Sequence, residues 1–195
     1  MEAYTYSKAL TQRERTEAVA LITLVFKRAG YISDETEQSS LSTRVLRGEA
    51  ATFLAKKGDL LCGTLSVFDD GPLGVPLEDI FAPEISELRN AGKKLAEVGQ
   101  FAVYDPRNDV TMPVGINPAL GLFKLVFAYA KANKIDTLCI TVNPKHERFY
   151  HAMGFVRWER ECSYAAVNGH PAVGMTLDLH IAEKGPVGLL RKLLF

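Results

Sequence analysis

One acidic residue, Glu97, lies in the middle of an apolar stretch that is typical of a β-strand, KLAEVGQFAVY at residues 94–104. Side chains alternate between the two faces of a strand. The face that Glu97 shares is otherwise apolar and consists of Leu95, Gly99, Phe101 and Val103. Burial disfavours a charged carboxylate and raises its pKa toward the range that suits proton transfer. Glu97 is therefore either a general base or a core glutamate that pairs with an arginine.

The elements before this strand are a helix, a polar loop and a hairpin. Thr11 and Glu14 form a capping-box pattern at the start of a helix predicted over Thr11–Ala29. The polar segment Tyr31–Glu49 predicts a mobile loop with one turn of helix. Two apolar runs, Ala50–Lys56 and Leu60–Phe68, are joined by Lys-Gly-Asp and predict a β-hairpin.

An acidic insertion separates the hairpin from the Glu97 strand. Residues 69–92 contain six acids and a single arginine, Arg89, together with three prolines. Pro83 and Glu84 indicate the start of a short helix, because proline and acids favour the first helical turn. Such a long excursion is either a functional or partner surface, or a solvated insertion.

The second half of the chain alternates helices and strands. A long apolar helix is expected from Asn117 and Pro118 to about Lys134, and a strand follows at Asp136–Asn143. A Pro144-initiated helix then runs to Met153. Two antiparallel strands are expected at the end, Phe155–Arg160 and Ala172–Leu179. This order predicts an α+β domain with a mixed sheet.

Composition narrows the class of protein. A chain of 195 residues with 47% hydrophobic residues suits one domain, expected over 1–183, followed by a basic amphipathic tail at 184–195. The 23 basic and 23 acidic residues cancel, which argues against a nucleic-acid partner. Three separated cysteines, no signal peptide and no membrane-spanning run favour a reduced, cytoplasmic setting without a metal site. The tail either docks on the domain or a dimer mate, or contacts a membrane surface.

Four segments resemble a known enzyme family. The stretch TVNPKHERFYHAMGF at residues 141–155 is similar to the strand–helix–Gly-Phe segment of the GNAT-fold acyltransferases. The segments GTLS at 63–66, GPLGVPLE at 71–78 and LAEVGQFAV at 95–103 resemble a narrower branch. That branch is the N-acyl amino acid synthases, the FeeM-like relatives of the acyl homoserine lactone synthases. The resemblance implies a GNAT-like fold with a mixed, mostly antiparallel sheet flanked by helices.

The resemblance also implies catalytic roles. Glu97 matches the strand carboxylate of the family and would remove a proton from the attacking amine or orient it, since an ammonium group cannot attack a thioester. Tyr150 matches the tyrosine that often protonates the departing thiolate, although packing alone would also explain it.

Substrate contacts follow from the same comparison. Backbone groups of Phe101, Ala102 and Val103 would bind a pantetheine arm where two strands separate. Asn143 either contacts the donor or simply caps the next helix. His146 is either solvent-facing or a substrate contact, and Arg44 is a candidate for gripping an acceptor carboxylate. Gly99 is counted as a substrate-binding position, yet it stands where the branch commonly has serine, so a hydroxyl role is absent there.

The predicted function is transfer of a fatty acyl chain from a thioester to the amino group of an amino acid. The loop at 105–116 has one glycine and two acids, unlike the basic Gly-rich turn that cradles the pyrophosphate of CoA, which favours acyl carrier protein as the donor. No tightly bound cofactor is expected, because the acyl thioester is a substrate. The alternatives are an acetyl-CoA-dependent acetyltransferase and a non-catalytic acyl-binding module.

Overall fold

The computed structural model describes residues 3–33, 40–105, 110–111 and 116–184. Most of the loop at 105–116 and of the tail at 184–195 therefore lies outside the described residues. The chain forms two compact units, one from Met1–Val67 and Gly99–Val126 and the other from Phe68–Val98 and Phe127–Phe195. Each unit is described by itself below.

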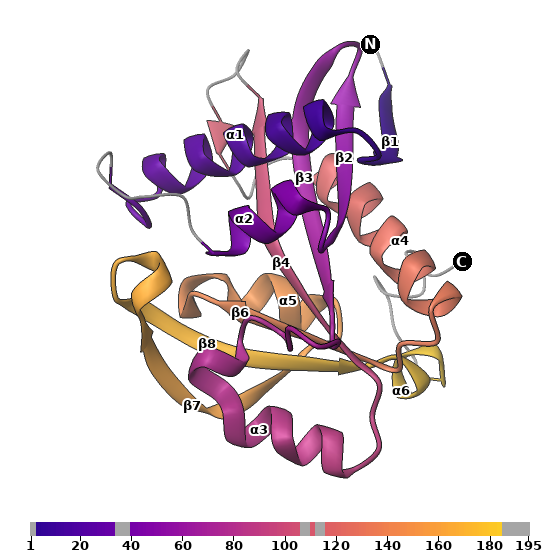
Figure 1. Cartoon of the computed structure of the whole chain (residues 1–195), viewed down its shortest axis with the longest axis vertical. Coiled ribbons are helices and arrows are strands. Elements are labelled where there is room, and N and C mark those ends of the chain that lie inside the picture. The colour runs from indigo at the N-terminus through magenta and orange to yellow at the C-terminus, as the bar shows by residue number, and fades with distance from the viewer. Residues whose placement is uncertain (1–2, 34–39, 106–109, 112–115, 185–195) are drawn as a thin grey trace. The chain divides into compact units, whose positions relative to one another are not determined.

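Figure 1 shows the helices and strands, which divide between the two units as follows. The first unit contains β1 (Tyr4–Lys8), α1 (Gln12–Arg28), α2 (Ser40–Arg47), β2 (Ala51–Lys57) and β5 (Val110–Thr111). The second contains α3 (Glu78–Asn90), β6 (Thr137–Val142), η1 (Pro144–His146), α5 (Glu147–Ala152), β7 (Val156–Tyr164), η2 (Ala165–Val167), β8 (His170–Asp178) and α6 (Leu179–Lys184). Three elements have residues in both units: β3 (Leu60–Asp69), β4 (Leu95–Asp105) and α4 (Ile116–Ala132).

In the first unit, helix α1 packs on the hairpin and on β4. The predicted capping box is present, because the Thr11 hydroxyl accepts from the Glu14 amide and the Glu14 carboxylate accepts from the Thr11 amide. Apolar residues of α1, Leu21, Ile22 and Val25, pack against Ala102 and Tyr104 of β4. Strand β2 pairs antiparallel with both β1 and β3, which confirms the predicted hairpin.

Two elements of the first unit differ from the sequence prediction. Strand β1 was not predicted, because its sequence YTYSK is polar and lacks the apolar pattern of a core strand. It lies at the edge of the sheet and pairs with β2 along one side. The polar loop predicted at 31–49 contains the eight-residue helix α2, which buries Ser42 and Val45. The prediction allowed one turn of helix in this segment, and burial of that one face explains why the helix is longer.

In the second unit, β6 lies at the centre of the strand pairing. It pairs in parallel with Leu95–Glu97 of β4 and antiparallel with β8, and β8 pairs antiparallel with β7 (Figure 1). The predicted mixed and mostly antiparallel sheet with flanking helices is confirmed. Helix α3 contributes Phe81 and Ile85 to a core that also contains Leu95 and Cys139.

Helix α3 begins earlier than the sequence predicts. It starts at Glu78 and contains Pro83, with non-helical backbone at Phe81 (φ −125°, ψ 35°). A proline lacks an amide hydrogen and its ring clashes with the preceding turn, so the helix bends just before it. Pro83 therefore marks a kink inside α3 and not its start.

Strand β4 contains one unusual backbone position. Gln100 has φ 52°, in the left-handed region that non-glycine residues seldom adopt. Such a residue interrupts the two-residue alternation of a strand, as in a β-bulge. The single face predicted from Leu95 to Val103 therefore does not continue past Gln100.

Candidate active site

Glu97 is buried in β4, as predicted. The residue is 4% exposed, and its Cα lies opposite that of Cys139 in the parallel pairing with β6. A buried carboxylate needs hydrogen-bond donors or an opposite charge to offset the loss of hydration.

A backbone amide from the acidic insertion supplies one such donor. The N–H of Leu77 donates to Oε2 of Glu97 at 2.5 Å. Leu77 precedes helix α3 as its N-cap residue and is itself fully buried. A backbone amide that donates to a buried carboxylate stabilises its negative charge, because hydrogen bonds to an ionised acceptor are stronger than neutral ones. The insertion is therefore built into the surroundings of Glu97, and the interpretation of it as a solvated excursion is wrong for this part.

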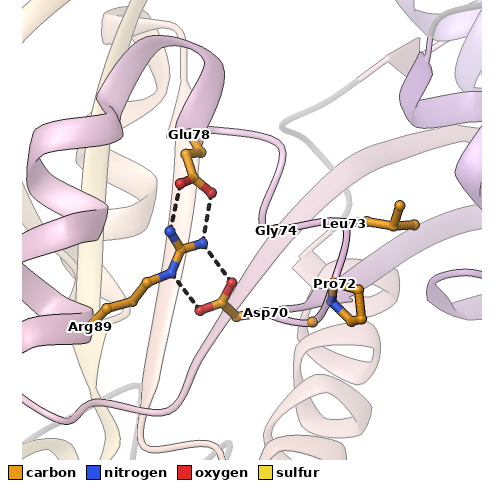
Figure 2. Close-up of a pocket in the computed structure, with 7 residues that line it drawn as sticks. Asp70, Pro72, Leu73, Gly74, Glu78 and Arg89 are labelled. Carbon is orange, nitrogen blue, oxygen red and sulfur yellow. Dashed lines mark hydrogen bonds and ion pairs between the residues drawn. The ribbon is translucent and has the colours of Figure 1, made fainter.

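An ion cluster holds the insertion in place (Figure 2). Arg89, in the last turn of α3, binds both carboxylate oxygens of Asp70 at 2.9 and 2.7 Å and both of Glu78 at 2.5 and 2.7 Å. The hydrogen bond from Arg89 holds the pKa of Glu78 below its ordinary value. Asp70 and Glu78 in turn raise the pKa of Arg89. An open surface pocket of about 500 Å³ is lined by this cluster and the loop Gly71–Gly74.

Burial and the negative charge of Glu97 raise the pKa of two side chains in the second unit, Cys139 and Tyr164. Burial, and then the negative charges of Glu97 and Asp70, raise the pKa of the Cys139 thiol. Burial, and then Glu97 and Asp79, raise the pKa of the Tyr164 phenol. Both groups stay protonated at neutral pH, so Tyr164 can donate a hydrogen bond through its O–H, although its raised pKa makes it a weaker acid than an ordinary phenol. Tyr164 and the Leu77 amide were not predicted as site groups, and the alternation of β7 is the one sequence signal that could have indicated Tyr164.

Tyr150 is buried on α5, in an aromatic cluster. Its ring meets Phe149 and Phe155 edge to face, with centroids 5.1 and 6.0 Å apart. This packing agrees with the structural alternative raised for Tyr150, while the role in protonating a thiolate stays a prediction.

Asn143 and His146 lie on either side of Pro144. The Asn143 side chain accepts from the Lys145 amide at 3.1 Å, so the predicted capping role is confirmed. His146 is half-buried, which corrects the expectation that it faces solvent. Burial, together with the nearby Lys145, lowers the pKa of His146, so its ring is neutral at pH 7.

The remaining predicted residues belong to the first unit. Phe101 is half-buried and meets Phe123 edge to face at 5.7 Å, and Ala102 and Val103 are buried. Gly99 lies beside Gln100, whose side-chain oxygen accepts from the Ser42 hydroxyl at 3.2 Å.

Arg44 lies on α2 and is half-buried. The second unit holds Glu97 with Tyr150, Asn143 and His146, whereas the first holds Arg44 and the β4 residues from Gly99 onward.

Metal ligation and membrane insertion have no support in the described part of the chain. No group of three or more His, Cys, Asp or Glu side chains there could hold a metal ion. No helix within the described ranges has the length and apolar character needed to cross a membrane.

Comparison with known proteins gives a consistent picture. Residues 17–178 match the family model described as N-acyl amino acid synthase FeeM. The structure of FeeM, an N-acyl amino acid synthase from uncultured soil microbes, is similar with a TM-score of 0.83 and 32% identity, over 98% of this chain and 99% of that one. No curated protein sequence matches the chain.

More distant structures share the fold. The AHL synthase LasI has a TM-score of 0.63 and 16% identity, with 92% of this chain and 91% of that chain covered. An acyl-CoA N-acyltransferase from Pseudomonas aeruginosa has a TM-score of 0.57 and 16% identity, with 90% and 99% covered. The predicted GNAT-like fold is thereby confirmed.

Proposed function

The chain belongs to the FeeM family of N-acyl amino acid synthases, and we propose that it transfers a fatty acyl chain from acyl carrier protein to the amino group of an amino acid. That it is an N-acyltransferase follows from the family. The observation that carries the mechanism is the buried Glu97 carboxylate, held by the Leu77 amide in a strand of the sheet.

The reaction exchanges one acyl bond for another. The amine nitrogen attacks the thioester carbonyl, a C–N bond forms and the C–S bond breaks, which releases the amide and the thiol of the donor. Glu97 takes the proton that the nitrogen must lose, directly or through a water molecule. The departing thiolate takes up a proton, for which we propose Tyr150 as the donor. A hydrogen bond from the Leu77 amide fixes one oxygen of the Glu97 carboxylate.

Substrate binding is assigned to the remaining predicted residues. Backbone groups of Phe101–Val103 and the side chain of Asn143 would hold the donor arm. The apolar side chains around Phe101, including Phe123 of α4, would line the acyl chain. Arg44 would bind the acceptor carboxylate bidentately, with Gly99 and His146 close to the acceptor.

The choice of acyl carrier protein over CoA rests on the sequence at 105–116. One glycine and two acids in this loop offer little to neutralise a pyrophosphate. A carrier-bound donor presents its phosphopantetheine arm without a free nucleotide, so it does not require such a cradle.

A direct assay tests this proposal. The purified full chain is incubated with a mixture of amino acids and one of three donors: a long-chain acyl carrier protein, the same acyl chain on CoA, or acetyl-CoA. Mass spectrometry then detects N-acylated products. We expect long-chain N-acyl amino acids, formed fastest from acyl carrier protein.

Each other outcome identifies a different function. Faster turnover with long-chain acyl-CoA would contradict the carrier-protein donor, and turnover with acetyl-CoA alone would indicate an acetyltransferase. Co-purified lipid without product from any mixture would indicate a binding module.

The tail is proposed as a peripheral membrane contact for a lipidic product, with residues 1–183 as the single catalytic domain. Lys184–Phe195 carries three bases and no acid, together with a stripe of leucines. Deletion of residues 188–195 should weaken binding to anionic phospholipid vesicles in a sedimentation assay. Unchanged binding would contradict the membrane role.

A further inference from the structure

The ion cluster of Arg89 joins the two ends of the segment that carries the Leu77 amide. Asp70 opens the segment and Glu78 comes directly after Leu77, so Arg89 bridges positions on both sides of it (Figure 2). Three charged side chains held by four hydrogen bonds of 2.5 to 2.9 Å leave little freedom to the backbone between them.

The loop between Asp70 and Glu78 packs closely against the ion cluster at Gly74. Gly74 has φ +62°, and a Cβ there would lie 2.7 Å from Oε2 of Glu78, one of the oxygens that Arg89 binds. Val75 and Leu77 are buried in the core of the second unit, which fixes the far end of the loop. A side chain at position 74 would therefore push the Glu78 carboxylate away from Arg89.

In the described part of the chain, the hydrogen bonds of Arg89 go to Asp70 and Glu78 and not to the Glu97 carboxylate. The effect of the cluster reaches Glu97 through the backbone amide of Leu77, which is one residue from Glu78. We propose that Arg89, with Asp70 and Glu78, is a positioning residue for catalysis: it aims the Leu77 N–H at Glu97 and so sets the orientation and proton affinity of the general base. This inference rests on the proposed role of Glu97.

Helix α3 offers a matched control for Arg89. Arg160 binds the Glu84 carboxylate at 2.7 and 3.0 Å and the Ile80 carbonyl at 2.6 Å, so it also ties α3 to its surroundings. Its contacts begin three residues after Leu77 and lie outside the segment that the cluster closes. Arg89→Met and Arg160→Met each remove an arginine that binds a carboxylate of α3 through two nitrogens, Arg89 from α3 itself and Arg160 from β7. Only Arg89→Met releases Leu77.

The experiment compares pH–rate profiles of acyl transfer for the wild type and both variants. We expect Arg89→Met to lower kcat by about ten-fold or more, since small misplacements of catalytic groups have effects up to about 100-fold. The acid limb should also move up by about one pH unit, because a carboxylate that loses a backbone donor binds a proton more readily. Arg160→Met should leave both quantities within two-fold and 0.2 pH units, on the order of experimental error.

Other titratable groups near Glu97 do not account for such a shift. Cys139 of β6 and Tyr164 of β7 stay protonated because burial and negative charge raise the pKa of each. Asp70 and Asp79 also contribute negative charge at these two groups. Arg89→Met also leaves the negative charges of Asp70 and Glu78 without their cation. These charges would raise the proton affinity of Glu97, as loss of the Leu77 hydrogen bond would. A second variant has to separate the two effects.

Glycine variants make this separation. Gly74→Ala displaces the Glu78 carboxylate but removes no charge, and Gly92→Ala imposes the same left-handed strain (φ +71°) with no atom within 4 Å of the new methyl. We expect Gly74→Ala to reproduce the loss of kcat and Gly92→Ala to leave kcat unchanged. This pair also decides the question if Arg89→Met does not fold.

The background variant Glu97→Gln distinguishes this inference from the proposed function. In that background, Arg89→Met should lower kcat less than about two-fold further, because no carboxylate remains to be oriented. The positioning role would be overturned if Arg89→Met lowered kcat equally in both backgrounds, or if Arg89→Met and Arg160→Met had equal effects. Neither result would contradict the role of Glu97 as the base. Full activity of Glu97→Gln alone would overturn the proposed role of Glu97 as the base, on which this inference rests, while absence of any N-acylated product from the wild type would overturn the proposed function.

Discussion

Glu97 and Cys139 face each other across the parallel pairing of β4 with β6. A carboxylate and a thiol in such register cannot both ionise at low cost, because neither is well hydrated and their charges repel. Burial and Glu97 accordingly raise the pKa of Cys139.

The first prediction concerns the reactivity of this thiol. Because the thiolate is the nucleophile, Cys139 should react with iodoacetamide at pH 8 at least about ten-fold more slowly than the half-buried Cys162 in the native protein. Mass spectrometry of alkylated peptides over time measures both rates. In urea the two rates should converge, and equal rates in the native protein would contradict the buried pairing.

The ion cluster predicts a pH dependence of stability. Arg89 holds the pKa of Glu78 below its ordinary value. The contribution of a carboxylate with a lowered pKa is fully present above its unfolded pKa of about 4.3 and is lost as the pH falls through the folded value. Glu78→Gln should therefore lower the free energy of unfolding by about 1 kcal/mol at pH 7 and by much less near about pH 3.

Urea unfolding at both pH values measures this difference. Glu161→Gln is the control, because the Glu161 side chain is 49% exposed in its pair with Arg157 and should contribute close to zero. A Glu78→Gln effect that is the same at pH 7 and pH 3 would contradict the account of the cluster.

The single tryptophan reports on the packing next to α3. Trp158 meets Phe81 edge to face at 5.3 Å, and a Cβ at Gly174 would lie 2.0 Å from its ring. Gly174→Ala must displace the indole, so we expect a loss of about 1–3 kcal/mol and a changed emission spectrum. Gly71→Ala, where a Cβ meets nothing within 4 Å, should change neither the stability nor the spectrum. Unaltered fluorescence in Gly174→Ala would contradict the close approach.

His146 should titrate as a half-buried imidazole. Burial and the adjacent Lys145 lower its pKa, so an NMR titration should give a midpoint below the ordinary value of about 6.5. Lys145→Gln should raise the midpoint only partly, since burial is the larger cause. A midpoint above 6.5 would show that the ring is solvated or paired with an acid.

Local sequence patterns predicted most of the elements and the burial of Glu97, but not strand β1, the full length of α2 or the start of α3. The capping box at Thr11, the hairpin around Gly58 and the cap at Asn143 depend on neighbouring residues, so a single sequence contains them. An isolated acid in an apolar strand is likewise visible without a structure.

The partners of these residues could not be predicted in the same way. The donor to Glu97 is a backbone amide 20 positions earlier, and every residue except proline carries one, so no sequence pattern marks Leu77. The acids of the insertion and Arg89 were visible, but which carboxylates the arginine binds depends on the path of the loop. The left-handed backbone at Gln100 has no glycine to indicate it.

The most direct test of the account is the rate of acyl transfer by Glu97→Gln from pH 6 to pH 9.5, with the donor that supports wild-type turnover. Glutamine can still accept from the Leu77 amide, so the fold should persist, which thermal unfolding checks. We expect kcat/KM to fall by about 100-fold or more at pH 7 and the defect to narrow toward pH 9.5, where the amine loses its proton to water. A variant that matches the wild type within two-fold at pH 7 would contradict the assignment of Glu97 as the base.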